Sequence, residues 1–326
     1  MELYDDIRYM EWNKDTHKLY TTPNTDILKT LTYNLDTQWT DDTLPKQILE
    51  YGKKPPLGIC DLHKLGITGK GVNVAIIDQP LALDHPEYKG KIKEYKLFCP
   101  KDYDMPISSM HGPSVTSFLV GTNTGVAPDA KVYFAGVPMW LGDAQYEAQA
   151  LKWIIETNKK LSEHDKIKFV SVSAAPGDNQ AREHNSDMWN KVVEEAENNG
   201  ICVVDCTEGH RFVSVGFVDY DDGKFKYGFP NRLMKNGQDN QVHVPNSLRT
   251  SAESYDNKTF SYAYWGTGGL SWGIPYAVGV MCLAQSVNPS LSALEIKKLL
   301  IDNANQNNHI INPTTFIKNI SKELIK

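Results

Sequence analysis

The chain has 326 residues, of which 40% are hydrophobic and 10% aromatic, so it can bury a large core. This composition excludes a disordered, collagen-like or coiled-coil protein. The formal net charge of −6, from 34 basic and 40 acidic residues, argues against a nucleic-acid-binding surface.

The N-terminus has acidic residues where a secretory signal peptide requires basic ones, and it lacks a continuous apolar stretch. No run of about 18 apolar residues is present, so we expect no membrane-spanning segment. The five cysteines form no CxxC pair, which favours reduced, mostly buried thiols in a cytoplasmic protein over disulfides or a metal site.

Residues 1–54 are polar and weakly periodic, and a Lys-Lys-Pro-Pro break follows at 53–56. We therefore expect an N-terminal arm over 1–54 and one α/β domain over 55–326. In that domain, nearly continuous apolar runs are typical of parallel strands buried on both faces, and they cover residues 72–78, 131–137, 167–173 and 201–206.

Helices are expected between these strands, over residues 143–161 and 186–199, with Ser186 as N-cap and Gly200 as the stop. A later helix opens at the capping box formed by Ser292 and Glu295. Residues 212–218 and 224–229 flank an Asp-Asp-Gly sequence and predict a hairpin. The alternation of strands and helices predicts a parallel sheet with right-handed crossovers.

Three polar residues stand where this fold would expose reactive groups. Asp78 ends the first strand, and the carboxyl ends of parallel strands are where functional groups gather. His111 opens an apolar helix. Ser271 follows a glycine-rich stretch and begins an apolar helix reaching about Gln285, with Pro275 in its first turn, so its N–H faces the positive end of the dipole. Taken alone, Asp78 and His111 are better explained as ordinary cap or turn residues, and a plain N-cap is the main alternative for Ser271.

Taken together, the order Asp, His, Ser resembles the subtilisin-like serine proteases (subtilases, peptidase S8 family), as do the spacings of 33 and 160 residues. The similarity runs from about residue 55 to 304. It includes the sequences at 68–72, 85–86, 125–130 (GVAPDA), 215–219 and 244–246. The resemblance implies a three-layer α/β subtilisin-like fold with a mainly parallel central sheet.

The resemblance also implies roles for individual residues. Ser271 would attack a peptide carbonyl, His111 would carry the proton and Asp78 would orient the imidazole. The Ser271 N–H and the Thr207 hydroxyl would form the oxyanion hole. The substrate would lie between two segments, which favour an apolar residue before the cleaved bond. One side is formed by Ser173, Ala174 and Ala175. The other is a second binding strand over residues 137–142, with Val137, Pro138, Met139 and Trp140.

Several positions depart from the family pattern. Gln79-Pro80 follows the aspartate in place of Ser/Thr-Gly, Trp272 follows the serine in place of Met, and Thr207 replaces the oxyanion-hole Asn. These departures predict a slow or narrowly specific serine endopeptidase. The alternative is a catalytically impaired subtilase fold that acts as a binding or regulatory module.

The short arm and the absence of a signal peptide are more similar to an intracellular subtilase, in which the arm would either cover the cleft until removed or pack on the surface. No cofactor is expected to be required. Calcium is common in the family, but the acidic residues 219–223 are better explained as a solvated turn. The expected partner is a protein or peptide substrate, with no nucleic acid and no membrane. The sequence leaves the oligomeric state and the natural substrate undetermined.

Overall fold

The computed structural model describes residues 1–10, 18–178, 184–218, 225–227, 241–306 and 309–321. Its centre is a five-stranded sheet in the order β3-β4-β2-β5-β6, in which all neighbours are parallel. These strands are β3 (Ile92–Leu97), β4 (Lys131–Gly136), β2 (Asn73–Asp78), β5 (Phe169–Val172) and β6 (Cys202–Val204). The parallel sheet expected from the four apolar runs is confirmed.

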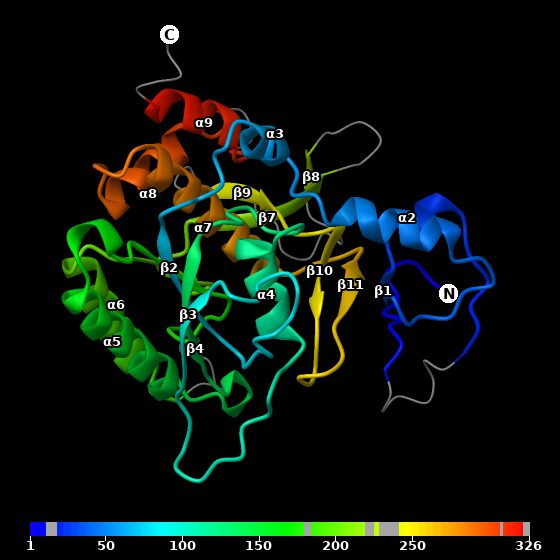
Figure 1. Ribbon diagram of the computed structural model, residues 1–326, viewed down its shortest axis with the longest axis horizontal. Helices are drawn as coiled ribbons and strands as arrows, with labels where there is room; N and C mark the ends of the chain where they lie inside the picture. The colour runs from blue at the N-terminus through cyan, green and yellow to red at the C-terminus, as the bar shows by residue number, and fades with distance from the viewer. Residues whose placement is uncertain (11–17, 179–183, 219–224, 228–240, 307–308, 322–326) are drawn as a thin grey trace.

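Helices cover both faces of this sheet (Figure 1). On β2, Val74 and Ile76 pack into the core shared with α4 (His111–Val120) and α7 (Leu270–Val287). The alternate residues Ala75 and Ile77 pack toward α5 (Gln145–Lys160) and α6 (Ser186–Asn198). Because both faces are covered, the strand is apolar along nearly its whole length. The three-layer α/β fold is therefore confirmed.

Helix α7 is long and apolar enough to cross a membrane by composition, but 78% of it is buried inside the protein. It packs against α4, β5 and β7 (Val213–Val218). Its apolar character is therefore that of a core helix, and it carries Ser271 in its first turn, as expected.

Two local expectations need correction. Strand β3 was not foreseen because it lies at the sheet edge, where its lysine and glutamate side chains are exposed and break the apolar pattern. Ser186 is the first residue of α6 rather than its cap, which is Asn185 in a left-handed conformation. Gly200 ends the segment with φ of 75°, and both hydrogen bonds of the Ser292–Glu295 capping box are present before α8 (Ala293–Asp302).

The expected hairpin pairs β7 with the antiparallel β8 (Phe225–Tyr227), and β9 (Val242–Pro245) lies parallel to β7 on its other side. The turn at 221–223 lies outside the described residues. The remaining short elements are α3 (Ile59–Lys64), α9 (Pro313–Ile320) and the 3-10 turns Met139–Leu141 and Glu163–Asp165.

The N-terminal arm contributes to a second, antiparallel sheet beside α4 (Figure 1). It contains α1 (Thr25–Leu28), β1 (Thr32–Asn34) and α2 (Thr43–Gly52). Strand β1 pairs with β11 (Ser261–Trp265), which pairs with β10 (Arg249–Glu253). Buried residues of both regions share one core, formed around Leu28, Leu31, Tyr33, Leu49, Leu248 and Tyr264. The arm is thus joined to the rest by a sheet and a core, and the domain boundary at residue 54 stays a prediction.

Candidate active site

Asp78 and His111 form a hydrogen-bonded pair at the carboxyl end of β2. Asp78 is the last residue of this strand, and its side chain is fully buried. His111 is the first residue of α4. Oδ1 of Asp78 lies 2.7 Å from Nδ1 of His111 and also accepts the backbone N–H of Gln79 at 2.8 Å. A carboxylate that accepts from Nδ1–H leaves Nε2 of the ring as the free base.

The start of α4 is held by Ser109 and by the absence of a side chain at Gly112. The Ser109 hydroxyl oxygen accepts the backbone N–H groups of His111 and Gly112, both at 3.1 Å. A Cβ atom at Gly112 would lie 2.2 Å from the carbonyl oxygen of Gln79. Gly112 therefore lets α4 approach the end of β2, which brings His111 within reach of Asp78. Sequence reasoning missed Ser109, because a serine before a helix has no spacing signal that marks it as a support.

The electrostatics of the pair favour a protonatable imidazole. Burial alone would lower the pKa of His111, but the charge of Asp78 and the hydrogen bond to it raise the pKa above its ordinary value of 6.5. The ring is therefore a stronger base than an exposed histidine, as general-base catalysis near neutral pH requires.

Ser271 and Ser173 are joined by two reciprocal hydrogen bonds. The Ser271 hydroxyl donates to the carbonyl of Ser173 at 3.1 Å, and the Ser173 hydroxyl donates to the carbonyl of Ser271 at 2.9 Å. That carbonyl has no partner within the helix, because Pro275 lacks the N–H that would bond it. Among the described residues, no hydrogen bond joins Ser271 to His111, so contact between them stays a prediction.

Trp272 nevertheless brings the start of α7 next to the histidine. Its indole packs on the imidazole of His111, with ring centroids 5.0 Å apart, and it is 5% exposed. Because Trp272 directly follows Ser271, this contact places all three candidate residues at one edge of the sheet. The sequence marked Trp272 only as a departure from the family pattern; its contact with His111 emerges from the packing of α7 on α4.

The two expected oxyanion donors differ in availability. Ser271 is the second residue of α7, where backbone N–H groups have no partner within the helix. The Thr207 hydroxyl donates to Oδ2 of Asp205 at 2.9 Å and accepts the N–H of Gly177 at 3.3 Å. Its single proton is therefore used by a buried carboxylate, and the oxyanion role of Thr207 stays a prediction.

Asp205 organises the loop after β6. Its buried carboxylate accepts the indole N–H of Trp189 at 2.8 Å and the backbone N–H of Thr207 at 3.1 Å, and Nδ1 of His210 lies 3.2 Å away. Burial raises the pKa of Asp205, whereas His210 opposes that shift. Sequence reasoning missed this second Asp–His pair, because Asp205 lies within an apolar run that predicts only a strand.

Ser173, Ala174 and Ala175 continue from the end of β5, on the same edge as Asp78. Ser173 is buried, whereas Ala174 and Ala175 are partly exposed. The carbonyl of Ala174 accepts the N–H of Cys206 at 2.8 Å, which ties this segment to the loop after β6. Small, partly exposed side chains leave room for a substrate, and the binding role of the segment stays a prediction.

The expectation of an extended binding strand over residues 137–142 is wrong. Val137 is fully buried, and its N–H donates to the carbonyl of Asp78 at 2.8 Å. Pro138 has no N–H, and Met139–Leu141 forms a 3-10 turn that ends at Gly142 with φ of 62°. Three N–H groups, those of Met139, Leu141 and Gly142, donate within the segment, so it is not an extended strand. The substrate-binding role of Val137, Pro138, Met139 and Trp140 stays a prediction.

The side chain of Trp140 is accessible at the surface. It is 45% exposed, and its indole N–H donates to the hydroxyl of Tyr103 at 2.8 Å. A substrate bound beside this turn would therefore contact the aromatic side chains of Trp140 and Tyr103 rather than the edge of a strand.

Within the described ranges, no group of three or more His, Cys, Asp or Glu side chains is arranged to hold a metal ion. The acidic residues 219–223 considered for calcium lie outside those ranges. All five cysteines are free thiols, and burial raises the pKa of Cys202, Cys206 and Cys282. The cytoplasmic location stays a prediction.

Comparison with known sequences supports the family expectation. Residues 69–211, which include Asp78 and His111, match the model of the subtilase family (Peptidase_S8). The chain is 23% identical over 284 residues to the subtilisin-like protease PopC of Myxococcus xanthus, covering 76% of this chain and 58% of PopC. It is 24% identical over 269 residues to subtilisin NAT of Bacillus subtilis subsp. natto, covering 77% and 66%. The chain thus spans less than two thirds of either relative.

Solved structures share the fold. The PatG macrocyclase in complex with peptide superposes with a TM-score of 0.60 at 14% identity, over 81% of this chain and 96% of that one. The prenylagaramide maturation protease PagA has a TM-score of 0.57 at 16% identity, over 81% and 98%. Residues 69–211 thus match the subtilase family model, and the chain shares the three-layer subtilisin-like fold of these solved structures.

Proposed function

We propose that this protein is a serine endopeptidase that hydrolyses peptide bonds through Ser271, His111 and Asp78. The observation that carries the proposal is the 2.7 Å hydrogen bond between the buried Asp78 carboxylate and His111. The names of PopC and subtilisin NAT, a protease and a subtilisin, support the same reaction class. A peptide substrate is supported by the PatG macrocyclase, which was solved with a peptide.

In the proposed reaction, the Ser271 hydroxyl rotates from the carbonyl of Ser173 to Nε2 of His111. His111 takes the proton as the serine oxygen attacks the scissile carbonyl, and Asp78 stabilises the imidazolium that forms. The Ser271 N–H, at the positive end of α7, stabilises the oxyanion. His111 then protonates the leaving amine, and a water activated by the same ring hydrolyses the acyl-enzyme.

The resting position of the serine supports a slow enzyme. A neutral hydrogen bond such as that from Ser271 to Ser173 contributes about 0.5–1.5 kcal/mol. It therefore lowers the population of the Ser271 rotamer that points to His111 by up to roughly tenfold. A substrate that takes over the Ser173 carbonyl as a strand partner would release the hydroxyl at the moment of binding.

Labelling with a fluorophosphonate probe tests the proposal. We expect the wild-type chain to be labelled once and Ser271→Ala not at all, because the probe reacts with an activated serine. Ser290→Ala is the matched control, since Ser290 is an exposed serine on the loop after α7, and it should label like wild type. Equal labelling of Ser271→Ala would mean another nucleophile. No labelling of the wild type, under conditions that label a known serine protease, would favour the binding or regulatory module.

A further inference from the structure

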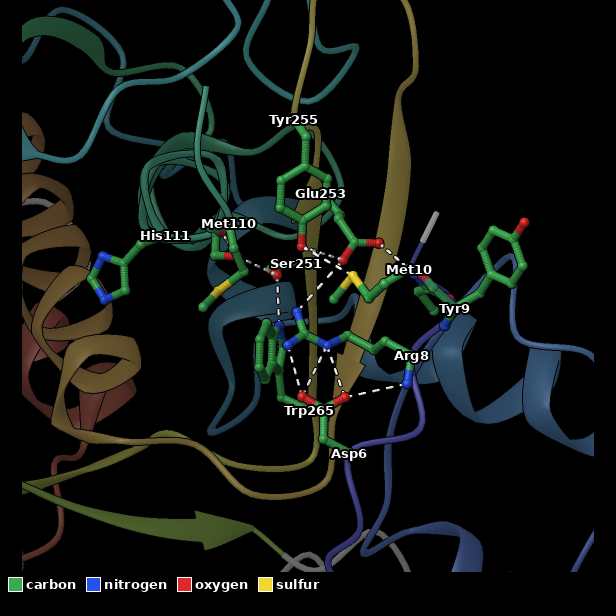
Figure 2. Close-up of polar contacts among 12 residues, drawn as sticks. Asp6, Arg8, Tyr9, Met10, Met110, His111, Ser251, Glu253, Tyr255 and Trp265 are labelled. Carbon is green, nitrogen blue, oxygen red and sulfur yellow. Dashed lines mark hydrogen bonds and ion pairs between the residues drawn. The ribbon is translucent and has the colours of Figure 1, made fainter. Parts of the chain in front are cut away.

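The N-terminal segment carries a buried cation, Arg8, whose guanidinium lies among Asp6, Glu253 and Trp265 (Figure 2). Residues 5–7 pair with β1 through the N–H of Ile7 to the carbonyl of Thr32 at 2.8 Å, and the N–H of Thr32 to the carbonyl of Asp5 at 2.9 Å. The side chain of the next residue, Arg8, is only 9% exposed. Burying a guanidinium costs free energy unless its charge is compensated. The groups that compensate Arg8 therefore show which parts of the protein this segment is attached to.

Two carboxylates and one aromatic ring hold Arg8. Its Nε and Nη2 atoms bind Asp6 at 2.9 and 2.7 Å, and its Nη1 atom lies 3.6 Å from Oε1 of Glu253, whose side chain is 5% exposed. The central guanidinium carbon lies 4.6 Å from the ring centroid of Trp265. A planar guanidinium can bind a carboxylate at two atoms and stack on a ring at once, which an ammonium group cannot.

A line of aromatic rings leads from Arg8 to the catalytic candidate His111. The rings of Trp265 and Trp272 have centroids 5.0 Å apart, and those of Trp272 and His111 are also 5.0 Å apart. Both tryptophans are at least 93% buried, so neither ring can move without displacing its neighbours.

A chain of hydrogen bonds leads to the same place. The indole N–H of Trp265 donates to the Ser251 hydroxyl at 2.8 Å. The Ser251 hydroxyl lies 2.9 Å from the Ser114 hydroxyl. The Ser114 hydroxyl donates to the carbonyl of Met110 at 3.0 Å. The Ser114 hydroxyl can also donate to the carbonyl of Ala252 at 3.3 Å, and its bond to Met110 reaches the residue before His111. Trp265 is therefore linked to His111 in two indirect ways, through the ring of Trp272 and through the backbone at the start of α4.

We propose that Arg8 is a positioning residue for His111, acting through Trp265, and that residues 5–8 support the active site in the working protein. This inference rests on the proposed function, because the position of His111 affects a rate only if His111 is the base. Under this proposal the segment is not a removable cover, since its loss would loosen the histidine and leave the Glu253 charge without its cation.

The test uses the full chain with Arg8→Met, Arg8→Lys and Trp265→Phe. Lys46→Met is the matched control, because it removes the same charge from an exposed ion pair with Asp42 on α2. We expect Arg8→Met to lower kcat for a peptide substrate about tenfold with KM within about twofold, Arg8→Lys to recover part of the loss, and Lys46→Met to match wild type.

A second measurement does not depend on activity. The proton between His111 and Asp78 should give a strongly deshielded proton NMR signal, assigned by its absence in His111→Ala. We expect this signal to shift or broaden in Arg8→Met and Trp265→Phe and to be unchanged in Lys46→Met. If the signal responds but the wild type shows no fluorophosphonate labelling, the positioning role stands and the proposed function fails.

Wild-type kcat and an unchanged proton signal in Arg8→Met would overturn the proposal, and so would a loss of kcat without any change in the signal. If Arg8→Met does not fold, the decision falls to Trp265→Phe, which keeps a ring but removes the hydrogen-bond donor. A wild-type signal in that variant and in Arg8→Lys would also overturn it.

Discussion

The two halves of the proposed triad differ in how their hydrogen bonds are used. On the acidic half, the buried Asp78 carboxylate and the His111 ring face each other at 2.7 Å. On the serine half, the hydroxyl of Ser271 donates to the backbone of Ser173, and the hydroxyl of Thr207 donates to a buried carboxylate. The first half is assembled before any substrate arrives, whereas the second has its protons committed elsewhere.

This difference follows from the chemistry of the groups. A carboxylate only accepts, and a histidine ring has a fixed direction for its N–H, so a buried pair of the two has essentially one good arrangement. A hydroxyl has one proton and turns about a single bond, so it donates to the nearest strong acceptor. Catalysis would therefore require rearrangement only on the serine half.

The largest expected effect comes from breaking the acidic half. Asp78→Asn should lower kcat about 10⁴-fold, because the amide would hold the imidazole in the wrong tautomer. Asp84→Asn, at an exposed aspartate paired with Lys89, is the control and should match wild type. A loss below about tenfold in Asp78→Asn would mean that His111 does not depend on this carboxylate.

A smaller effect is expected from adding volume to the backbone that carries the pair. Gly112→Ala would place a Cβ 2.2 Å from the carbonyl of Gln79, so we expect a loss of about 1–3 kcal/mol in the free energy of unfolding and a fall in labelling of at least tenfold. A Cβ at Gly209, two residues after Thr207, would meet no atom within 4 Å, so Gly209→Ala should be tolerated. Urea unfolding and probe labelling compare the two variants. Equal losses in Gly112→Ala and Gly209→Ala would contradict the role assigned to Gly112.

Thr207→Val tests how the serine half uses its proton. Because the Thr207 hydroxyl donates to buried Asp205, we expect the change to cost about 1–3 kcal/mol of unfolding free energy and to alter kcat less than about threefold. Chemical denaturation and steady-state kinetics separate the two quantities. A fall in kcat of about tenfold at unchanged stability would instead support Thr207 as an oxyanion donor.

The smallest effect concerns pH. The proposed reaction needs neutral His111, whose pKa lies above its ordinary value of 6.5, so kcat/KM should rise with pH and reach half its maximum above pH 6.5. The same raised pKa stabilises the fold below pH 6.5, and this stabilisation is lost as pH rises through the folded pKa. In Asp78→Asn only burial remains, so an NMR titration of His111 should show a midpoint below 6.5. A midpoint unchanged between the two proteins would contradict the assigned cause.

The central sheet could be read from the sequence because strands such as β2 are buried on both faces, and burial leaves a continuous apolar run. The same reasoning placed Asp78, His111 and Ser271 at element ends, since polar residues at the ends of apolar runs mark the edge of such a sheet. It missed β3, whose exposed lysines and glutamate carry no such pattern.

Sequence alone therefore determined the layers of this protein and the edge at which its candidate residues gather. Only the tertiary structure decided which groups they contact: Ser271 with Ser173, Thr207 with Asp205, and the cation of Arg8 on Trp265. Apolar periodicity is a local property, because it depends on neighbours along one helix or strand. A hydrogen bond between residues about 100 positions apart, such as Ser271 to Ser173, depends on how α7 settles against β5, and that is set by packing of the whole core.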